Sequence, residues 1–302
     1  MLAKTQNSFD SQDEFIPSQF DKKQAAEPVV IAPVLSEFSD RQKFKADEFA
    51  IPADFWATLN TDKGVAAEIE RIISWYPGVD TVKIKVGTGI REDLVRIARV
   101  RKHLPNAKIR VDVNGSWSVD DAVFNIRTIY GEIAGNFLEY VEQPVATLDE
   151  LKELKERLIV DVKIAGDEVL RKARDPFAIN LDGAVDVLML KVAPLGGIKR
   201  SLELAAHHKL PVVVSSALES AVGISHGLRL ASQLPKLDYA CGLATSELFD
   251  EDLAQLPIVN GVMSVSTPVI DDERLQRFAV GPERLEWWRN RIKEVWKLRR
   301  AA

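Results

Sequence analysis

The chain has 302 residues, 46% of them hydrophobic and 28% charged, a composition typical of a soluble globular protein of one or two domains. A formal net charge of −5 without a basic block argues against nucleic acid or an anionic membrane as a partner. One cysteine excludes a disulfide framework and a cysteine-cluster metal site, and no apolar run is long enough to span a membrane. Because the N-terminus lacks the apolar run of a secretory signal, we expect a cytoplasmic protein.

The N-terminal stretch, residues 1–26, is polar and without clear periodicity, so we expect it to be weakly ordered. Order is expected to begin at PVVIAPVL (28–35), and FAIPADFWATL (49–59) fits an opening strand. From there β-branched runs alternate with stretches of helical periodicity, which indicates a parallel sheet covered by helices on both faces. The runs are TVKIKVG (81–87), KIRVDVNG (108–115), FLEYVEQP (137–144), VDVKIAGDE (160–168), VDVLMLKV (185–192), LPVVVSS (210–216) and LDYACGL (237–243).

A polar residue stands near the end of most of these runs and recurs about every 25 residues, the length of one βα unit of a barrel. Residues 50–246 supply the length of a complete barrel. A dinucleotide-binding fold would need a glycine-rich first turn, and the nearest candidate, GTGI (87–90), lacks the third glycine. The polar residues are Lys85, Asp112, Glu142, Asp167, Lys191 and Ser215.

After the barrel, the segment 284–300 has the periodicity of a helix. Its apolar residues recur in steps of three and four and form one face, which we interpret as a packing or capping surface rather than a partner-binding one. These residues are Leu285, Trp288, Ile292, Val295 and Leu298.

Three successive strands end in a carboxylate: Asp112, Glu142 and Asp167. In a closed βα barrel these ends meet at one mouth, where the carboxylates would repel one another strongly unless a cation neutralises them. Oxygen ligands favour a hard ion, so we expect Mg²⁺ with Mn²⁺ as a substitute, and the absence of histidine from the set argues against zinc. Glu168, which follows Asp167, is expected to point away from the mouth by strand alternation.

Two lysines on one strand and one on another complete the mouth. Lys83 and Lys85 are two residues apart and therefore share one side of their strand, while Lys191 ends the strand opposite to theirs in the ring. Removal of a proton next to a carboxylate gives an enediolate, whose negative charge a divalent ion stabilises. A lysine can remove that proton when neighbouring positive charge disfavours its ammonium form.

The ordered motifs KIK (83–85), DVNGSW (112–117), EQP (142–144), GDE (166–168) and LKVAPLGG (190–197) resemble the enolase superfamily in its muconate-lactonizing subgroup. With SSALESAVG (215–223) and YACGL (239–243), the set is most similar to the o-succinylbenzoate synthases of the actinobacterial type. The resemblance implies an α/β fold, a (β/α)7β TIM-like barrel with a small α+β capping domain that is reduced at the N-terminus. It divides the chain into a remnant of the cap (1–48), the catalytic barrel (49–246) and a C-terminal segment that completes the capping region (247–302).

The resemblance also implies an activity, a Mg²⁺-dependent lyase reaction on a small carboxylate substrate. This is the syn dehydration of 2-succinyl-6-hydroxy-2,4-cyclohexadiene-1-carboxylate to 2-succinylbenzoate, a menaquinone precursor, through an enediolate. Asp112, Glu142 and Asp167 would be the metal ligands, Lys85 the base, Lys83 its electrostatic partner and Lys191 a cation over the substrate ring. Asn114 would orient the substrate, and Ser215, Ser216 and the backbone near Gly242 would hold the succinyl tail.

Two rival interpretations stay open, and we expect a monomer or small homo-oligomer under any of them. In the first, the same site racemises N-acylamino acids or epimerises dipeptides, with Lys85 and Lys191 exchanging protons on opposite faces of the substrate. In the second, the barrel is a degenerate, non-catalytic one kept for binding, against which the full set of lysines and carboxylates argues.

Overall fold

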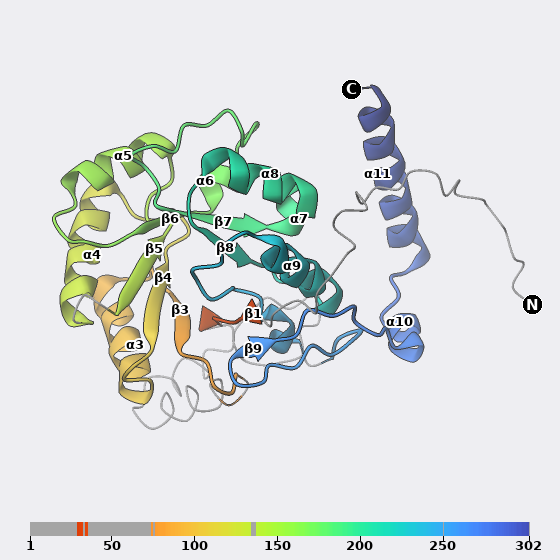
Figure 1. Ribbon diagram of the computed structural model, residues 1–302, viewed down its shortest axis with the longest axis horizontal. Helices are drawn as coiled ribbons and strands as arrows, with labels where there is room; N and C mark the ends of the chain where they lie inside the picture. The colour runs from red at the N-terminus through yellow and green to blue at the C-terminus, as the bar shows by residue number, and fades with distance from the viewer. Residues whose placement is uncertain are drawn as a thin grey trace, which may run out of the picture.

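The structure is a computed structural model that describes residues 29–32, 34–35, 74, 76–133, 137–249 and 251–301 (Figure 1). Its centre is a curled sheet of seven parallel strands, in which each strand pairs with the next along the chain. This order is the one expected when every strand returns through a helix on the outside. The strands are β2 (Val34–Leu35), β3 (Thr81–Lys85), β4 (Lys108–Asp112), β5 (Leu138–Glu142), β6 (Ile164–Gly166), β7 (Val187–Lys191) and β8 (Val212–Ser215).

Helices cover the outer face of the sheet, and their starts are encoded locally (Figure 1). The helix after β5 begins with a capping box, in which Thr147 and Glu150 each accept a hydrogen bond from the other's backbone N–H. The helix after β4 begins at Ser118, whose hydroxyl accepts from the N–H of Asp121 at 3.1 Å. The helices are α3 (Ile90–His103), α4 (Val119–Glu132), α5 (Leu148–Arg157), α6 (Glu168–Arg171), α7 (Val192–Leu195), α8 (Ile198–His208) and α9 (Ala221–Gln233).

The ring of strands is closed by two short segments. Cys241 N–H donates to Val30 O at 2.6 Å, and Ala32 N–H donates to Cys241 O at 2.8 Å. On the other side, Gly242 forms a parallel bridge with Ser215 at the end of β8. Residues 29–35 therefore take the first place in the ring and residues 241–242 the eighth, which confirms the predicted TIM-like barrel. The segment 49–59, predicted as the opening strand, lies outside the described residues.

The inside of the barrel is filled rather than open. Arg110 lies there with 1% of its surface exposed, and its guanidinium stacks on the ring of Tyr140 at 4.8 Å from the centroid. It donates from Nε to Glu139 at 2.6 Å and from Nη1 to the carbonyl of Ala240 at 2.7 Å. The guanidinium thus links β4 and β5 to the closing segment beneath the mouth.

The C-terminal part contains η2 (Thr245–Leu248), β9 (Val262–Met263), α10 (Asp272–Arg277) and α11 (Pro282–Ala301). Strand β9 pairs antiparallel with β1 (Val29–Val30). The predicted terminal helix is confirmed as α11, but its expected packing face is 40% to 65% exposed at Leu285, Trp288, Ile292 and Val295. Figure 1 gives the reason, since α11 stands away from the barrel helices. Among the described residues, the longer helices all lack an apolar stretch sufficient to cross a membrane.

The loop before β9 requires glycine at position 261. Gly261 has φ +76°, and a Cβ built there would lie 2.6 Å from Gly78 O, a backbone atom. Gly183 has φ +72° with open space around it. We expect Gly261→Ala to lower the free energy of unfolding by about 1–3 kcal/mol more than Gly183→Ala. Alanine is strained by the left-handed backbone at both positions, but only at position 261 would its Cβ overlap a neighbouring backbone atom. Urea denaturation measures both, and equal losses would contradict this account of the loop.

Candidate active site

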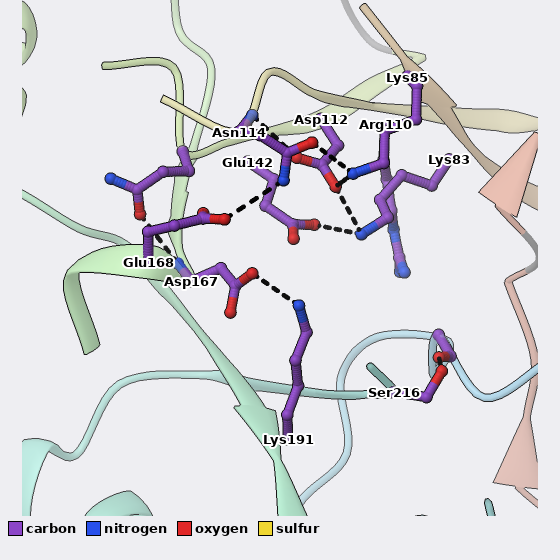
Figure 2. A network of polar contacts seen from close by, with 12 residues as sticks. Lys83, Lys85, Arg110, Asp112, Asn114, Glu142, Asp167, Glu168, Lys191 and Ser216 are labelled. Atoms are coloured by element: carbon purple, nitrogen blue, oxygen red, sulfur yellow. Dashed lines mark hydrogen bonds and ion pairs between the residues drawn. The ribbon is translucent and has the colours of Figure 1, made fainter. Parts of the chain in front are cut away.

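The predicted charged residues lie together at the carboxyl ends of the strands (Figure 2). The parallel register sets Lys85 beside Asp112 and Asp112 beside Glu142, while Asp167 directly follows β6. Lys191 ends β7, and the register sets it beside Ser215. Side chains from residues more than 100 positions apart in the sequence thus share one mouth, as expected for a parallel barrel.

Lys83 is buried between two of the carboxylates. Its Nζ lies 2.7 Å from Glu142 Oε2 and 3.1 Å from Asp112 Oδ2, and its side chain is 6% exposed. Burial alone would lower the pKa of Lys83, but the charges of Asp112 and Glu142 outweigh burial and raise it above its ordinary value. Lys83 is therefore held as an ammonium ion.

The pKa values of Asp112 and Glu142 are shifted in opposite directions, although both carboxylates contact Lys83. Burial would raise the pKa of Asp112, but Lys83 and then Lys85 outweigh it and bring the value down to about 2. For Glu142, burial and then the neighbouring charge of Asp112 raise the pKa to about 7, against the opposing effect of Lys83. Glu142 is thus the less compensated of these two charges.

Lys85 reaches further into the mouth than Lys83. Its Nζ donates to Asp112 Oδ2 at 2.6 Å and to Asn114 Oδ1 at 2.6 Å. Its side chain is 38% exposed, so a molecule in the mouth can contact this amine but not that of Lys83. Asn114, with φ +53°, bends the chain directly after β4, and this places its side chain over the strand end.

On the opposite side, Lys191 Nζ donates to Asp167 Oδ2 at 2.6 Å. Arg171, one turn along α6, contacts both carboxylate oxygens of Asp167 and also donates to Glu168 Oε1 at 2.5 Å. Glu168 in turn accepts from Asn114 Nδ2 at 3.3 Å. Through Arg171, a continuous chain of polar contacts therefore links Lys191 on β7 to Lys85 on β3. Figure 2 shows its contacts between Lys191 and Asp167 and between Glu168 and Asn114.

Sequence reasoning missed two members of this network. Glu168 was expected to point outward, but it is 7% exposed and bonded to Asn114 and Arg171. Strand alternation fails because β6 ends at Gly166 and α6 begins at Glu168. Arg171 stands four residues after Asp167, a spacing that brings two side chains together on a helix. Its contact with Asp167 could be predicted only if a helix were expected there.

The residues present fit a hard divalent cation in donor type. The candidate ligands Asp112, Glu142 and Asp167 are all carboxylates, and Glu142 Oε1 is buried without a hydrogen-bond partner. As the side chains stand, the described ranges contain no group of three or more His, Cys, Asp or Glu residues spaced to hold a metal. Lysine ammonium groups lie against these carboxylates and offset their charge. Repulsion among the carboxylates therefore does not by itself require a metal. The ligand roles stay a prediction.

The residues predicted to hold a succinyl tail lie at the end of β8. Ser216 Oγ donates to Gly242 O at 2.9 Å and contacts Thr245 Oγ1 at 2.9 Å. A Cβ at position 242 would lie 2.8 Å from Ser215 Oγ, so glycine permits the close approach of these two segments. Figure 2 shows Ser216 apart from the charged network, and its tail-binding role remains a prediction.

A cavity of about 480 Å³ opens beside this network. It touches the network through Asn114 and Glu168, and Thr147, Lys172 and Ile179 are among the residues on its other sides. Lys83, Lys85 and Lys191 do not line it. Because the lysines predicted to transfer or stabilise charge lie outside this cavity, we expect the chemistry at the lysine-lined mouth.

Comparison with known proteins identifies the family. The family model for the enolase C-terminal domain-like fold matches residues 65–269. The o-succinylbenzoate synthase of Mycobacterium tuberculosis (strain ATCC 25618 / H37Rv) is 46% identical over 237 residues, 77% of this chain and 71% of the relative. That of Mycobacterium marinum is 45% identical over 236 residues, 77% of this chain and 70% of the relative.

Solved structures agree on the fold. A crystal structure of an isomerase from Streptomyces coelicolor A3(2) superposes with a TM-score of 0.63 at 25% identity, covering 83% of this chain and 65% of that one. Muconate cycloisomerase from Pseudomonas fluorescens gives a TM-score of 0.66 at 23% identity, covering 86% of this chain and 68% of that one. The chain belongs to the enolase superfamily, in the family of the o-succinylbenzoate synthases.

Proposed function

We propose that the protein is a hydro-lyase that dehydrates 2-succinyl-6-hydroxy-2,4-cyclohexadiene-1-carboxylate to 2-succinylbenzoate, a step toward menaquinone. The mycobacterial relatives bear the name of this activity at 46% identity. One observation at the site carries the assignment. Of two lysines on the same side of β3, one is buried as an ammonium ion and the other is open to the mouth.

This difference divides the roles. Lys83 is held between Asp112 and Glu142 and keeps its proton, so it serves as a fixed positive charge. Lys85 is the exposed amine and therefore the base. In its neutral form it takes the proton from the carbon that bears the carboxylate, and that C–H bond breaks. It then returns the proton to the departing hydroxyl on the same face, so that the C–O bond breaks and water leaves.

The geometry supports a separate role for Lys191. It ends β7, across the barrel from β3, and Asp167 fixes its ammonium group by an ion pair of 2.6 Å. From there its charge faces the substrate ring from the side opposite Lys85 and stabilises negative charge as it develops. A syn dehydration needs one proton-transfer group, and Lys85 supplies it.

The family implies a divalent metal ion, and we propose Mg²⁺ with Mn²⁺ as a substitute. Asp112, Glu142 and Asp167 would hold it, because three carboxylates match the preference of these hard ions for oxygen. When bound, such an ion supplies positive charge to the substrate carboxylate while the neighbouring proton is removed. Asn114 would orient the substrate beside Lys85, and Ser215, Ser216 and the backbone at Gly242 would contact its succinyl tail.

Loss of the base should stop the reaction at its first step. We expect Lys85→Ala to lower kcat by about 10²–10⁴-fold and to abolish exchange of the substrate's α-proton with solvent deuterium, because Lys83, the other amine on that side of β3, is buried. NMR measures both. Lys199→Ala, which removes a 67% exposed lysine on α8, is the matched control and should react as the wild type does. Unchanged proton exchange in Lys85→Ala would assign the base to another group.

Substitution of Lys191 distinguishes the dehydratase from a racemase on the same site. Arginine keeps the charge but exchanges protons poorly near neutral pH, whereas alanine removes the charge as well. We expect Lys191→Arg to retain measurable dehydration and Lys191→Ala to retain at least tenfold less, a difference of about 1.4 kcal/mol in transition-state stabilisation. Equal loss in both, with wild type that racemises an N-acylamino acid faster than it dehydrates, would favour the racemase.

Removal of one predicted ligand should separate metal binding from folding. A ligand present at 100 times its Kd stabilises the folded state by about 2.7 kcal/mol, so Mg²⁺ should raise the Tm of the wild type. In Glu142→Gln we expect most of this shift to vanish and activity to be nearly lost. Glu153→Gln, at a 55% exposed position on α5, should keep both. An undiminished Mg²⁺-induced shift in Glu142→Gln would remove Glu142 from the ligand set.

A further inference from the structure

Gln143 lies at the junction of the three strand ends that carry the candidate ligands. It directly follows Glu142, is 0% exposed and has no assigned part in the chemistry. Its side chain points away from the substrate side and into the backbone of the neighbouring segment, as its hydrogen bonds show. It belongs to the EQP motif, of which the function described above uses only Glu142.

Every polar group of Gln143 has a partner, and the partners lie on three different segments. Its Oε1 accepts from Asp167 N–H at 3.1 Å and from Val169 N–H at 3.2 Å. Its Nε2 donates to Val145 O at 2.8 Å, within its own loop. Its backbone carbonyl accepts from Gly115 N–H at 2.7 Å, just after β4, and its N–H donates to Ala165 O at 2.8 Å in β6.

The backbone at Gln143 is held in an unfavourable conformation to make these bonds. Its φ is +39°, in the left-handed region that few residues other than glycine adopt. Such a conformation is strained and persists only where the surroundings fix it. The turn separates Glu142, which faces the mouth, from Gln143, which faces the segment after β6. The strain is therefore part of how this loop aims two adjacent side chains in different directions.

We propose that Gln143 is a positioning residue that fixes the spacing of the candidate ligands before a metal binds. The Gln143 amide oxygen holds Asp167 through its backbone N–H, and Glu142 directly precedes Gln143 in the chain. Asp112 lies three residues before Gly115, whose N–H donates to the Gln143 carbonyl. Partners that orient ligands typically contribute 10–100-fold to metal affinity. The proposal rests on the proposed function for the ligand assignment, and it adds the residue that makes their arrangement rigid.

The test is Gln143→Met, which keeps the length of the side chain but removes its acceptor and donor. Mn²⁺ alone is titrated into the metal-free protein, and the EPR signal of the free ion gives the Kd. We expect a Kd at least tenfold weaker than that of the wild type, with faster hydrogen exchange at the amides of Asp167 and Val169. Gln143→Glu keeps an oxygen at the same reach, so these two amides should stay protected in it.

A general loss of stability is controlled by Leu230→Ala, which opens a cavity at a 0% exposed position on α9, away from the three strand ends. It should leave the Kd for Mn²⁺ within twofold of the wild type. A wild-type Kd in Gln143→Met, undisturbed amides there, or equal weakening in Leu230→Ala would overturn the positioning role. A wild-type protein that binds no Mn²⁺ would instead overturn the proposed metal site on which this role depends.

Discussion

Charges buried at one rim must compensate one another, and this constraint governs the whole mouth of the barrel. Asp112, Glu142 and Asp167 are at most 2% exposed, where an isolated carboxylate is strongly disfavoured. Each is paired with a lysine from a strand one or two places away in the sheet. Removing one member would leave a buried charge without its partner, a loss of about 3–5 kcal/mol in typical cases. The predicted ligands and lysines therefore also hold one another in place.

The scaffold supplies the positions that this compensation requires. Parallel strands in chain order bring their carboxyl ends to one rim, and the register sets Lys85, Asp112 and Glu142 side by side. Closure through residues 29–35 and 241–242 turns the sheet into a ring, so that β7 faces β3 across it. Beneath the rim, Arg110 and the tyrosines around it fill the barrel and support the strands from within. The chemistry depends on both strands of that facing pair.

Much of this site could be predicted because it follows from local pattern. Alternation places Lys83 and Lys85 on one side of a strand, and the recurrence of polar strand ends predicts a barrel whose mouth they share. The unequal burial of these two lysines could not be predicted, since it depends on how far Asp112 and Glu142 project from the neighbouring strands. The resemblance predicts that Lys85 is the base, and the geometry adds a physical reason, because Lys85 is the more exposed of the two lysines. This role stays a prediction.

Other features were hidden because they arise where regular patterns end. Arg171 and Glu168 join the network through a short helix that begins at once after β6, and no pattern in the sequence marks the left-handed backbone at Gln143. The sequence argument for a metal treated the three carboxylates as uncompensated, whereas the lysines and Arg171 already balance much of their charge. The case for the metal therefore rests on the family, the oxygen-only donor set and the unpartnered oxygen of Glu142.

The proposed activity of this mouth is a metal-dependent dehydration. The most direct measurement treats the purified protein with a chelator, adds 2-succinyl-6-hydroxy-2,4-cyclohexadiene-1-carboxylate, and follows 2-succinylbenzoate by chromatography and mass spectrometry before and after Mg²⁺ is restored. The account predicts formation at the uncatalysed rate without metal and rapid formation once Mg²⁺ is present. A folded protein that stays at the uncatalysed rate with Mg²⁺, or that works equally well after chelation, would contradict it.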